Sequence, residues 1–189
     1  GARTSNLLSP PAPPKTTQLV MTFTALTENA RVGVLEGDIA TSIDADSLSG
    51  LGAEVVLVNT DDGFGGECHL DAVMVRSGID RLQLADLDLL LIENVGNLVC
   101  PAEFDVGQDA RAMVYAITEG EEKPLKYPVM FRAVDAVVVN KMDLLPHLDF
   151  DLGLFRDNLS KINPDAKVFE VSAKSGEGLD EWIAWLAGA

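Results

Sequence analysis

The stretch Val137-Val138-Val139-Asn140-Lys141-Met142-Asp143 decides the fold. Its continuous apolar run is typical of a central strand that is covered on both faces of a parallel sheet. The polar sequence N-K-x-D follows where this strand ends, and open parallel sheets bind their ligands at that edge. The stretch therefore predicts an α/β protein whose ligand contacts lie at the carboxyl ends of its strands.

The rest of the chain alternates short apolar strands with helical segments, which predicts a mainly parallel sheet. We expect one domain, residues 1–189, because the sequence shows neither an internal repeat nor a long linker. The expected strands are Ser5–Leu8, Arg31–Leu35, Glu54–Asn59, Leu87–Ile92, Ala112–Ile117, Val134–Val139 and Lys167–Val171. The expected helices are Lys15–Glu28, Asp44–Leu51, Leu70–Ile79, Phe150–Ile162 and Leu179–Leu186, the last with a core-facing stripe of Leu179, Trp182, Ile183 and Leu186.

Composition restricts the possible partners and the compartment. With 14 basic and 30 acidic residues, the net charge is −16. Nucleic acids and anionic membranes are bound by basic patches, so we expect neither as a partner. No apolar run reaches the roughly 18 residues of a membrane span, and no leader sequence opens the chain. The two cysteines, Cys68 and Cys100, are too few for a secreted disulfide scaffold, which favours reduced thiols and the cytoplasm.

The N-K-x-D sequence predicts a guanine-binding pocket. Guanine presents N1–H and N2–H₂ donors along one edge, and the Asp143 carboxylate can accept both, whereas adenine cannot form this pair. The Asn140 amide can meet the O6/N7 edge, and the Lys141 stem can lie along the ring. The next strand ends in Ser172-Ala173-Lys174, whose backbone N–H can reach O6. The alternative is a pair of ordinary polar turns.

The phosphate side of the site departs from the usual loop, G-x-x-x-x-G-K-[ST]. Lys15 and Thr16 hold the lysine and magnesium-hydroxyl positions, followed by Thr17, but Ser9 and Pro14 replace the glycines. Proline lacks an N–H, so this loop offers phosphate fewer donors than a glycine loop. We expect the helix N-terminus to attract phosphate with reduced affinity. The alternative is a proline-stiffened entry to a helix.

Two acidic side chains at strand ends are candidates for magnesium binding. Asp38 and Glu93 can hold the ion directly or through water, with Thr16 supplying a hydroxyl. The Gly96 N–H can contact a γ-phosphate, so the Glu93–Gly96 loop can sense whether that group is present. The alternative for each acid is a solvated loop or a helix cap.

A second, softer metal site is indicated by Cys68, His69 and Cys100. Thiolate and imidazole ligands suit Zn²⁺ or Ni²⁺, and a two-fold dimer would double the ligand supply. The alternative is a buried cysteine beside a surface histidine. Cys100 follows the Glu93–Gly96 loop so closely that movement of the loop should move the thiolate. His147 has no soft ligand near it in sequence and is interpreted as an ordinary loop residue.

Several long strings resemble HypB, the nickel-incorporation GTPase of hydrogenase maturation and a SIMIBI-class GTPase, and the resemblance runs from about residue 5 to residue 186. The strings are Glu36–Asp46, Cys68–Ala72, Glu93–Pro101 and Lys123–Pro128, together with Asn140–Asp143 and Ser172–Lys174.

The resemblance implies a three-layer α/β/α fold of the P-loop NTPase type. It implies a GTP-dependent protein that uses GTP/GDP and Mg²⁺, with Asp38 in the first switch region near magnesium and the attacking water. Because the sequence has no identifiable glutamine or arginine finger, we expect slow GTP hydrolysis, with Lys15, Asp38 and Gly96 as catalytic residues. It also implies a homodimer that delivers nickel to the hydrogenase large subunit with a partner metallochaperone, with Ni²⁺ or Zn²⁺ in the thiol site.

Three departures from the family pattern leave alternatives open. The phosphate loop lacks its glycines, the loop Asp61–Glu67 is long, and no histidine-rich or cysteine-bearing N-terminal segment is present. One alternative is a dimeric nickel or zinc carrier with impaired nucleotide binding. Another is a urease or cobalamin-enzyme chaperone, against which Cys68-His69 with Cys100 argues.

Overall fold

The computed structural model describes residues 1–11, 15–27, 30–38, 54–60 and 67–188. Its strands are β1 Arg3–Leu8, β2 Val32–Asp38, β3 Glu54–Asn59, β4 Leu89–Glu93, β5 Ala110–Ala116, β6 Ala136–Asn140 and β7 Lys167–Glu170. Its α-helices are α1 Lys15–Thr27, α3 Ala72–Ile79, α4 Lys123–Lys126, α5 Pro128–Arg132, α6 Leu152–Ile162 and α7 Leu179–Ala187. Short 3₁₀ turns are η1 Leu84–Asp86, η2 Cys100–Ala102, η3 Ile117–Glu119 and η4 Met142–His147.

The strands form one seven-stranded sheet in the order β3-β2-β4-β1-β5-β6-β7. Every described strand pair is parallel. The chain builds outward from β1 toward β3 and then returns to build β5, β6 and β7 on the other side. Ligands bind outside the carboxyl ends of the strands at such a reversal, so the topology places the predicted motifs at one edge.

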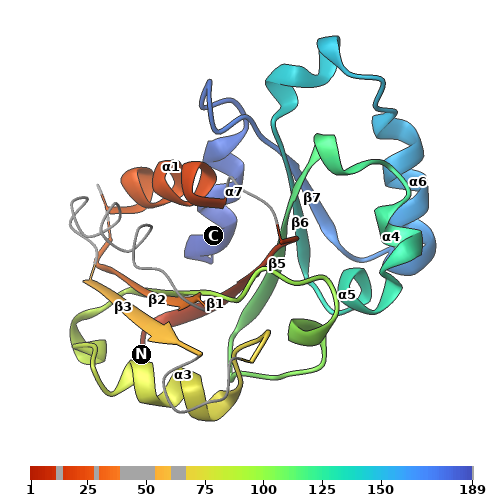
Figure 1. Ribbon diagram of the computed structural model, residues 1–189. Coiled ribbons are helices and arrows are strands. Elements are labelled where there is room, and N and C mark those ends of the chain that lie inside the picture. Colours follow the sequence, from red (N-terminus) through yellow and green to blue (C-terminus); the bar gives the residue numbers. More distant parts are fainter. Residues whose placement is uncertain (12–14, 28–29, 39–53, 61–66, 189) are drawn as a thin grey trace.

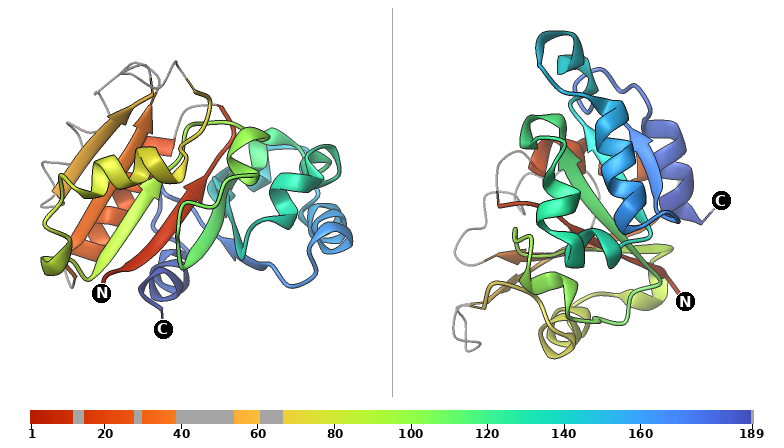
Figure 2. Two further views of the ribbon diagram at one scale, coloured as in Figure 1. Left: turned by 90° about the horizontal axis from the view of Figure 1, so that it is seen from below. Right: turned by 90° about the vertical axis from the view of Figure 1, so that its right-hand side faces the viewer.

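Helices cover both faces of the twisted sheet, which makes three layers (Figure 1). On one face, Phe23 of α1 and Trp182 of α7 are fully buried against the sheet. On the other face, Met74 of α3, Phe131 of α5 and Phe155 of α6 pack on two further core clusters. The right-hand view of Figure 2 shows α7 and α3 on opposite sides of the sheet. The predicted three-layer α/β/α fold is confirmed.

The expected strands Leu87–Ile92 and Val134–Val139 correspond to β4 and β6, and every residue of β4 and β6 is buried, as in central strands. The predicted stripe on α7 is confirmed as core packing: Leu179, Trp182 and Leu186 are buried, and Ile183 packs at the margin of their cluster. Among the helices that the structure describes, none has the length and apolar character needed to cross a membrane.

The helix boundaries differ from the sequence prediction at identifiable residues. Helix α3 begins at Ala72, not Leu70, because the Asp71 side chain accepts a hydrogen bond from Met74 N at 2.8 Å and caps the helix there. Helices α4 and α5 were not expected. Each has a proline within its first two positions and only about one turn, too short for a helical period to show. The predicted helix Asp44–Leu51 lies outside the described residues.

Carboxylates close the opposite, amino-terminal edge of the sheet. Asp88, Asp109 and Asp135 each accept a backbone N–H at the start of another strand, at 2.8–2.9 Å. These bonds satisfy donors that lie beyond the strand ladder. These three carboxylates therefore have structural partners at the amino edge, and the predicted ligand motifs gather at the other edge.

Candidate functional site

The N-K-x-D turn leaves β6 through a left-handed backbone position. Lys141 has φ 64°, and it is the one non-glycine residue with positive φ in the described part of the chain. The side chain of Asn140, only 4% exposed, stabilises this turn because its Oδ1 accepts Lys141 N at 2.7 Å. Positive φ is uncommon for a side chain of this size, and such positions cluster at functional sites.

Hydrogen bonds join the two base-contacting sequences into one unit. Asn140 Oδ1 also accepts Ala173 N at 3.1 Å, and the Ser172 hydroxyl donates to Asp143 Oδ1 at 2.7 Å. Met142 N donates to Val171 O at 3.1 Å. The structure therefore brings together the two sequences that were predicted to contact a base, and Ser172 holds the Asp143 carboxylate between them.

Polar groups of this hydrogen-bonded unit remain available for further contacts. Asp143 is half-buried, and a carboxylate has lone pairs beyond the one that Ser172 occupies. Ser172 is itself held, since its hydroxyl accepts Ser175 N at 3.1 Å. Lys174 is exposed. The Ala173 N–H, expected to reach guanine O6, is already bound to Asn140 Oδ1, so a base oxygen at this place would share the donor.

The phosphate side is described in part. Lys15, Thr16 and Thr17 form the first turn of α1, as expected. Pro14, which replaces a loop glycine, lies outside the described residues. Ser9 is buried at the end of β1, where its carbonyl oxygen accepts Asn97 N at 3.0 Å. The reduced phosphate affinity that the prolines imply therefore stays a prediction.

A pair of buried acids lies at the ends of β2 and β4. Glu36 and Glu93 are register partners, 3% and 6% exposed. Glu36 lies two residues after Val34, and Glu93 lies two residues after Leu91. Since residues two apart on a strand share a face and both Val34 and Leu91 pack in the cluster under α1, the two carboxylates lie on the face that α1 covers. Asp38 ends β2 and Gly96 is half-buried beyond β4.

These carboxylates are hard oxygen donors of the kind that suits magnesium. The sequence prediction named Asp38 and Glu93 but missed Glu36. Period-two alternation along the strand, which relates position 36 to position 38, was the available signal.

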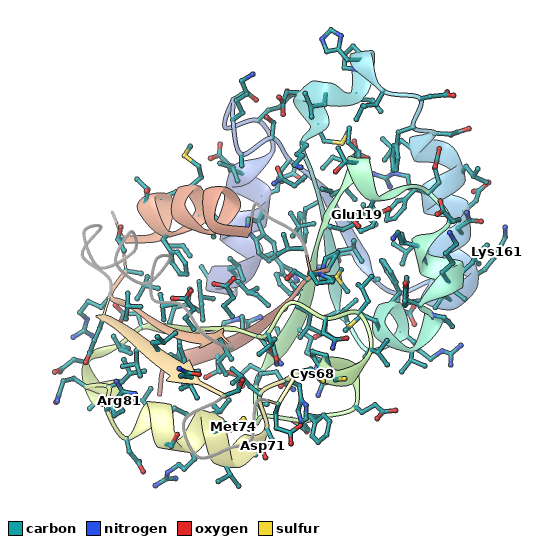
Figure 3. The ribbon with its side chains drawn as sticks, in the orientation of Figure 1. Cys68, Asp71, Met74, Arg81, Glu119 and Lys161 are labelled. Atoms are coloured by element: carbon teal, nitrogen blue, oxygen red, sulfur yellow. The ribbon has the colours of Figure 1, made fainter. Side chains whose placement is uncertain are left out.

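The two cysteines lie in contact although 32 residues separate them. The Cys68 S–H donates to Cys100 Sγ, with the sulfur atoms 2.6 Å apart, and both thiols are free and half-buried. The hydrogen bond to Cys100 and then burial raise the pKa of the Cys68 thiol. Figure 3 shows Cys68 on the α3 side of the sheet, near Asp71 and Met74. We refer to Cys68 and Cys100 as the thiol pair.

His69 does not join the thiol pair. Its ring stacks on Phe104 with centroids 3.7 Å apart, and its Nδ1 lies 4.0 Å from Glu67 Oε2. Within the described ranges, no three His, Cys, Asp or Glu side chains gather closely enough to hold a metal ion. The expected set of three ligands is thus not assembled by one chain here. His147 is exposed at the end of η4.

Comparison with known proteins shows the family of the chain. Residues 14–170 match the family model described as CobW/HypB/UreG, nucleotide-binding domain. The hydrogenase maturation factor HypB of Azotobacter chroococcum is 49% identical over 181 residues, which cover 96% of this chain and 58% of that protein. The chain thus spans less than two thirds of the length of this curated relative.

Solved structures agree as well. HypB from Archaeoglobus fulgidus superposes with a TM-score of 0.88 at 34% identity, covering 99% of this chain and 89% of that one. HypB from Helicobacter pylori, crystallised in complex with nickel, superposes with a TM-score of 0.91 at 32% identity, covering 100% and 86%. The chain therefore belongs to the CobW/HypB/UreG nucleotide-binding family and, within it, to HypB.

Proposed function

We propose that the chain binds and slowly hydrolyses GTP and that this cycle assists nickel insertion during hydrogenase maturation. The observation that carries the proposal is the hydrogen-bonded unit of Asn140, Asp143, Ser172 and Ala173. In this unit Ser172 holds the Asp143 carboxylate beside the end of β6, and a carboxylate there can select guanine by accepting its N1–H and N2–H₂ donors. The biological role is supported by the 49% identity to a hydrogenase maturation factor, of which the chain covers 58%.

The chain's own residues have separate tasks in this proposal. Asn140 and Asp143 hold the base. Lys15 and the first turn of α1 bind the phosphates. Asp38 and Glu93, with Thr16, would hold a magnesium ion that neutralises charge on the phosphates. Since the sequence offers no identifiable arginine finger or water-positioning glutamine, hydrolysis by one chain is slow.

Asp143→Asn tests the base assignment by exchanging one acceptor for a donor. Xanthine carries an oxygen where guanine carries the N2 amine, so the introduced amide can donate to it, whereas the native carboxylate repels it. We expect the variant to lose fluorescent GDP affinity and to gain affinity for the xanthosine analogue, each by about tenfold or more. Lys174→Ala, which changes an exposed neighbour, is the matched control. Equal GDP affinity in Asp143→Asn and the unchanged protein would remove the assignment.

Nickel is the proposed cargo, and the thiol pair is its proposed site. Two thiolates are soft donors that suit Ni²⁺ or Zn²⁺, but they leave the coordination sphere incomplete. A second copy of the chain would supply a second pair, so we propose a homodimer that shares the metal. Val99, next to Cys100, is 56% exposed and so presents an apolar side chain at the proposed contact. Light scattering with and without Ni²⁺, on the unchanged protein and Cys100→Ala, tests this arrangement.

The setting of the reaction follows from the same proposal. Nickel would pass from a partner metallochaperone through the thiol pair to the hydrogenase large subunit. Both steps require reduced thiols, so we propose the cytoplasm as the compartment. Pull-down of the partner chaperone in reducing buffer, compared between the unchanged protein and Cys68→Ala, would show whether the thiol pair contributes to the handover.

One observation favours a second candidate, a dimeric metal carrier with little nucleotide binding. The chain has Pro14 where phosphate loops have glycine, and proline donates no N–H. Titration of a fluorescent GTP analogue against the unchanged protein and Pro14→Gly separates the two functions. Binding and turnover by the unchanged protein support the GTPase, whereas binding by the glycine variant alone supports the carrier.

A further inference from the structure

Asn94 connects the loop after β4 to the segment that carries Cys68. Asn94 is fully buried, and its Oδ1 accepts both Leu70 N and Val95 N at 2.9 Å. Its Nδ2 donates to Asn6 Oδ1 at 3.4 Å, and its backbone N donates to Leu7 O at 3.0 Å. One side chain thus ties β1, the loop after β4 and the chain two residues beyond Cys68.

Asn97 makes the matching connection to Cys100. Its Nδ2 donates to Cys100 Sγ at 3.4 Å, while its Oδ1 accepts Val99 N at 2.8 Å and Cys100 N at 3.3 Å. Its backbone N donates to Ser9 O at 3.0 Å, at the entrance to the phosphate segment. Gly96, the glycine expected at the γ-phosphate, immediately precedes Asn97.

Leu70 links the same unit to the end of β2. Its side chain is fully buried against Gly37, and a Cβ built on Gly37 would lie 2.7 Å from Leu70 Cγ. Gly37 precedes Asp38, the expected magnesium-side residue. The segment around Cys68 is therefore packed on β2 and hydrogen-bonded to the loop after β4. It thus contacts the ends of both strands that carry residues of the proposed magnesium site.

We propose that Asn94 and Asn97 are positioning residues that couple the Gly96 loop to the thiol pair, so that the nucleotide state sets the geometry offered to nickel. This inference rests on the proposed function and identifies its internal connection. The two asparagines lie on either side of Gly96, and each holds one arm of the thiol pair. Movement of the loop toward a γ-phosphate would therefore be transmitted to the thiol pair through these two sets of hydrogen bonds. Side chains that bridge a ligand's neighbours in this way tune metal affinity.

The test compares two nucleotide states in the full chain. Cys100 alkylation by N-ethylmaleimide, followed by mass spectrometry, is measured in metal-free protein with GDP and with a non-hydrolysable GTP analogue. Ni²⁺ affinity is then titrated in the same two states. For the unchanged protein we expect at least about a fivefold difference between the states in Ni²⁺ affinity, the lower end of ordinary coupling. The alkylation rate should differ in parallel.

Three variants of Asn97 and Asn94, with one control, show which residues carry the coupling. In Asn97→Ala, the ratio of Ni²⁺ affinities and the ratio of alkylation rates between the two nucleotide states should both fall close to one. Asn97→Asp keeps the acceptor for Val99 N but loses the N–H···S donor, so it should retain part of both differences. Gln108→Ala is the matched control, because Gln108 makes similar local amide hydrogen bonds beyond Cys100 without touching the thiol pair. Its ratios should equal those of the unchanged protein. Thermal unfolding establishes that each variant is folded, and Asn94→Ala repeats the test on the Cys68 arm.

The outcomes are distinguishable. If the unchanged protein binds both nucleotides but shows equal alkylation and Ni²⁺ affinity in the two states, the coupling is overturned while GTP binding stands. Ratios in Asn97→Ala and Asn94→Ala that match the unchanged protein would likewise overturn it. If the unchanged protein binds neither nucleotide, the proposed function falls, and the coupling falls with it.

Discussion

Asn140→Ala should destabilise the fold as well as remove a base contact, because its side chain anchors two backbone donors. Oδ1 accepts Lys141 N at 2.7 Å and Ala173 N at 3.1 Å. Lys141 is half-buried, so water can replace its partner, and the loss is about 1 kcal/mol. Ala173 is 6% exposed, so its N–H is left with little access to water, at a cost of about 2 kcal/mol.

The expected total is therefore about 3 kcal/mol, a large part of the stability of an ordinary domain. In urea, a slope of about 2 kcal/mol per molar would lower the unfolding midpoint by about 1.5 M. GDP affinity, measured below the transition, should fall more than about tenfold, because the amide contact and the shape of the turn are both lost.

Asn163→Ala is the matched control for this prediction. Asn163 also makes two hydrogen bonds to the backbone, with Nδ2 donating to Phe131 O at 3.0 Å and to Val134 O at 2.8 Å. It lies at the amino edge of the sheet, so its loss should cost a similar free energy without changing GDP affinity. The reasoning is refuted if the free energies of unfolding of Asn140→Ala and the unchanged protein differ by less than about 0.5 kcal/mol, the scale of neutral surface substitutions. A fall in GDP affinity of the same size in Asn163→Ala would refute it too.

Three further predictions concern the surroundings of the site. Gly178 has φ 73°, and a Cβ there would overlap the Glu170 carbonyl oxygen, so Gly178→Ala should lower the free energy of unfolding by at least about 3 kcal/mol. Gly176→Ala, with φ 84° and nothing within 4 Å, should cost only about 1 kcal/mol in the same denaturation assay, and equal losses would contradict the account. Diamide should oxidise the thiol pair to an intramolecular disulfide with the loss of two hydrogens by mass spectrometry, and Cys100→Ser should abolish this product; a purely intermolecular product would exclude the contact. The side-chain hydrogen bond from Arg31 lowers the pKa of Asp88 below its ordinary value, so this carboxylate stabilises the fold above its unfolded-state pKa, and the contribution disappears as pH falls through its folded-state pKa. Asp88→Asn should therefore flatten the acid limb of the stability–pH curve, and an unchanged limb would show that the ion pair contributes nothing.

Local patterns predicted the elements whose environment is uniform along their length. β4 and β6 are buried at every residue, so their continuous apolar runs sufficed. The meeting of the N-K-x-D and Ser172–Lys174 sequences could also be predicted, because they follow adjacent parallel strands and must lie at one edge of the sheet. Of the paired acids, only Glu93 was named in advance, because it lies at a strand end. Glu36 lies within β2, where period-two alternation relates it to Asp38 but does not indicate that Glu93 is its partner on the neighbouring strand.

Contacts set by packing between distant segments could not be predicted. His69 follows Cys68 in sequence, but the chain bends at these two residues, and the His69 ring stacks on Phe104. The Asn94 contacts reach residues 24 and 88 positions away, a distance at which spacing carries no information. Helices α4 and α5 were missed because one turn is shorter than the period by which a helix is recognised.

The strength of the Asn94 and Asn97 hydrogen bonds limits how far a nucleotide cycle can change the nickel affinity of the thiol pair. Hydrogen bonds such as those of Asn94 and Asn97 contribute about 0.5–1.5 kcal/mol each, and a nucleotide alters only the part that differs between its two states. The resulting coupling is about 1–3 kcal/mol, or about 5–150-fold in nickel affinity. A change of that size does not empty a tight thiolate site into solution, but it suffices to reverse the balance between two sites of comparable affinity. The GTP cycle should therefore drive direct transfer to an acceptor protein: without an acceptor, GTP addition should leave nickel bound, and release of free Ni²⁺ to a weak colorimetric chelator would contradict this mechanism.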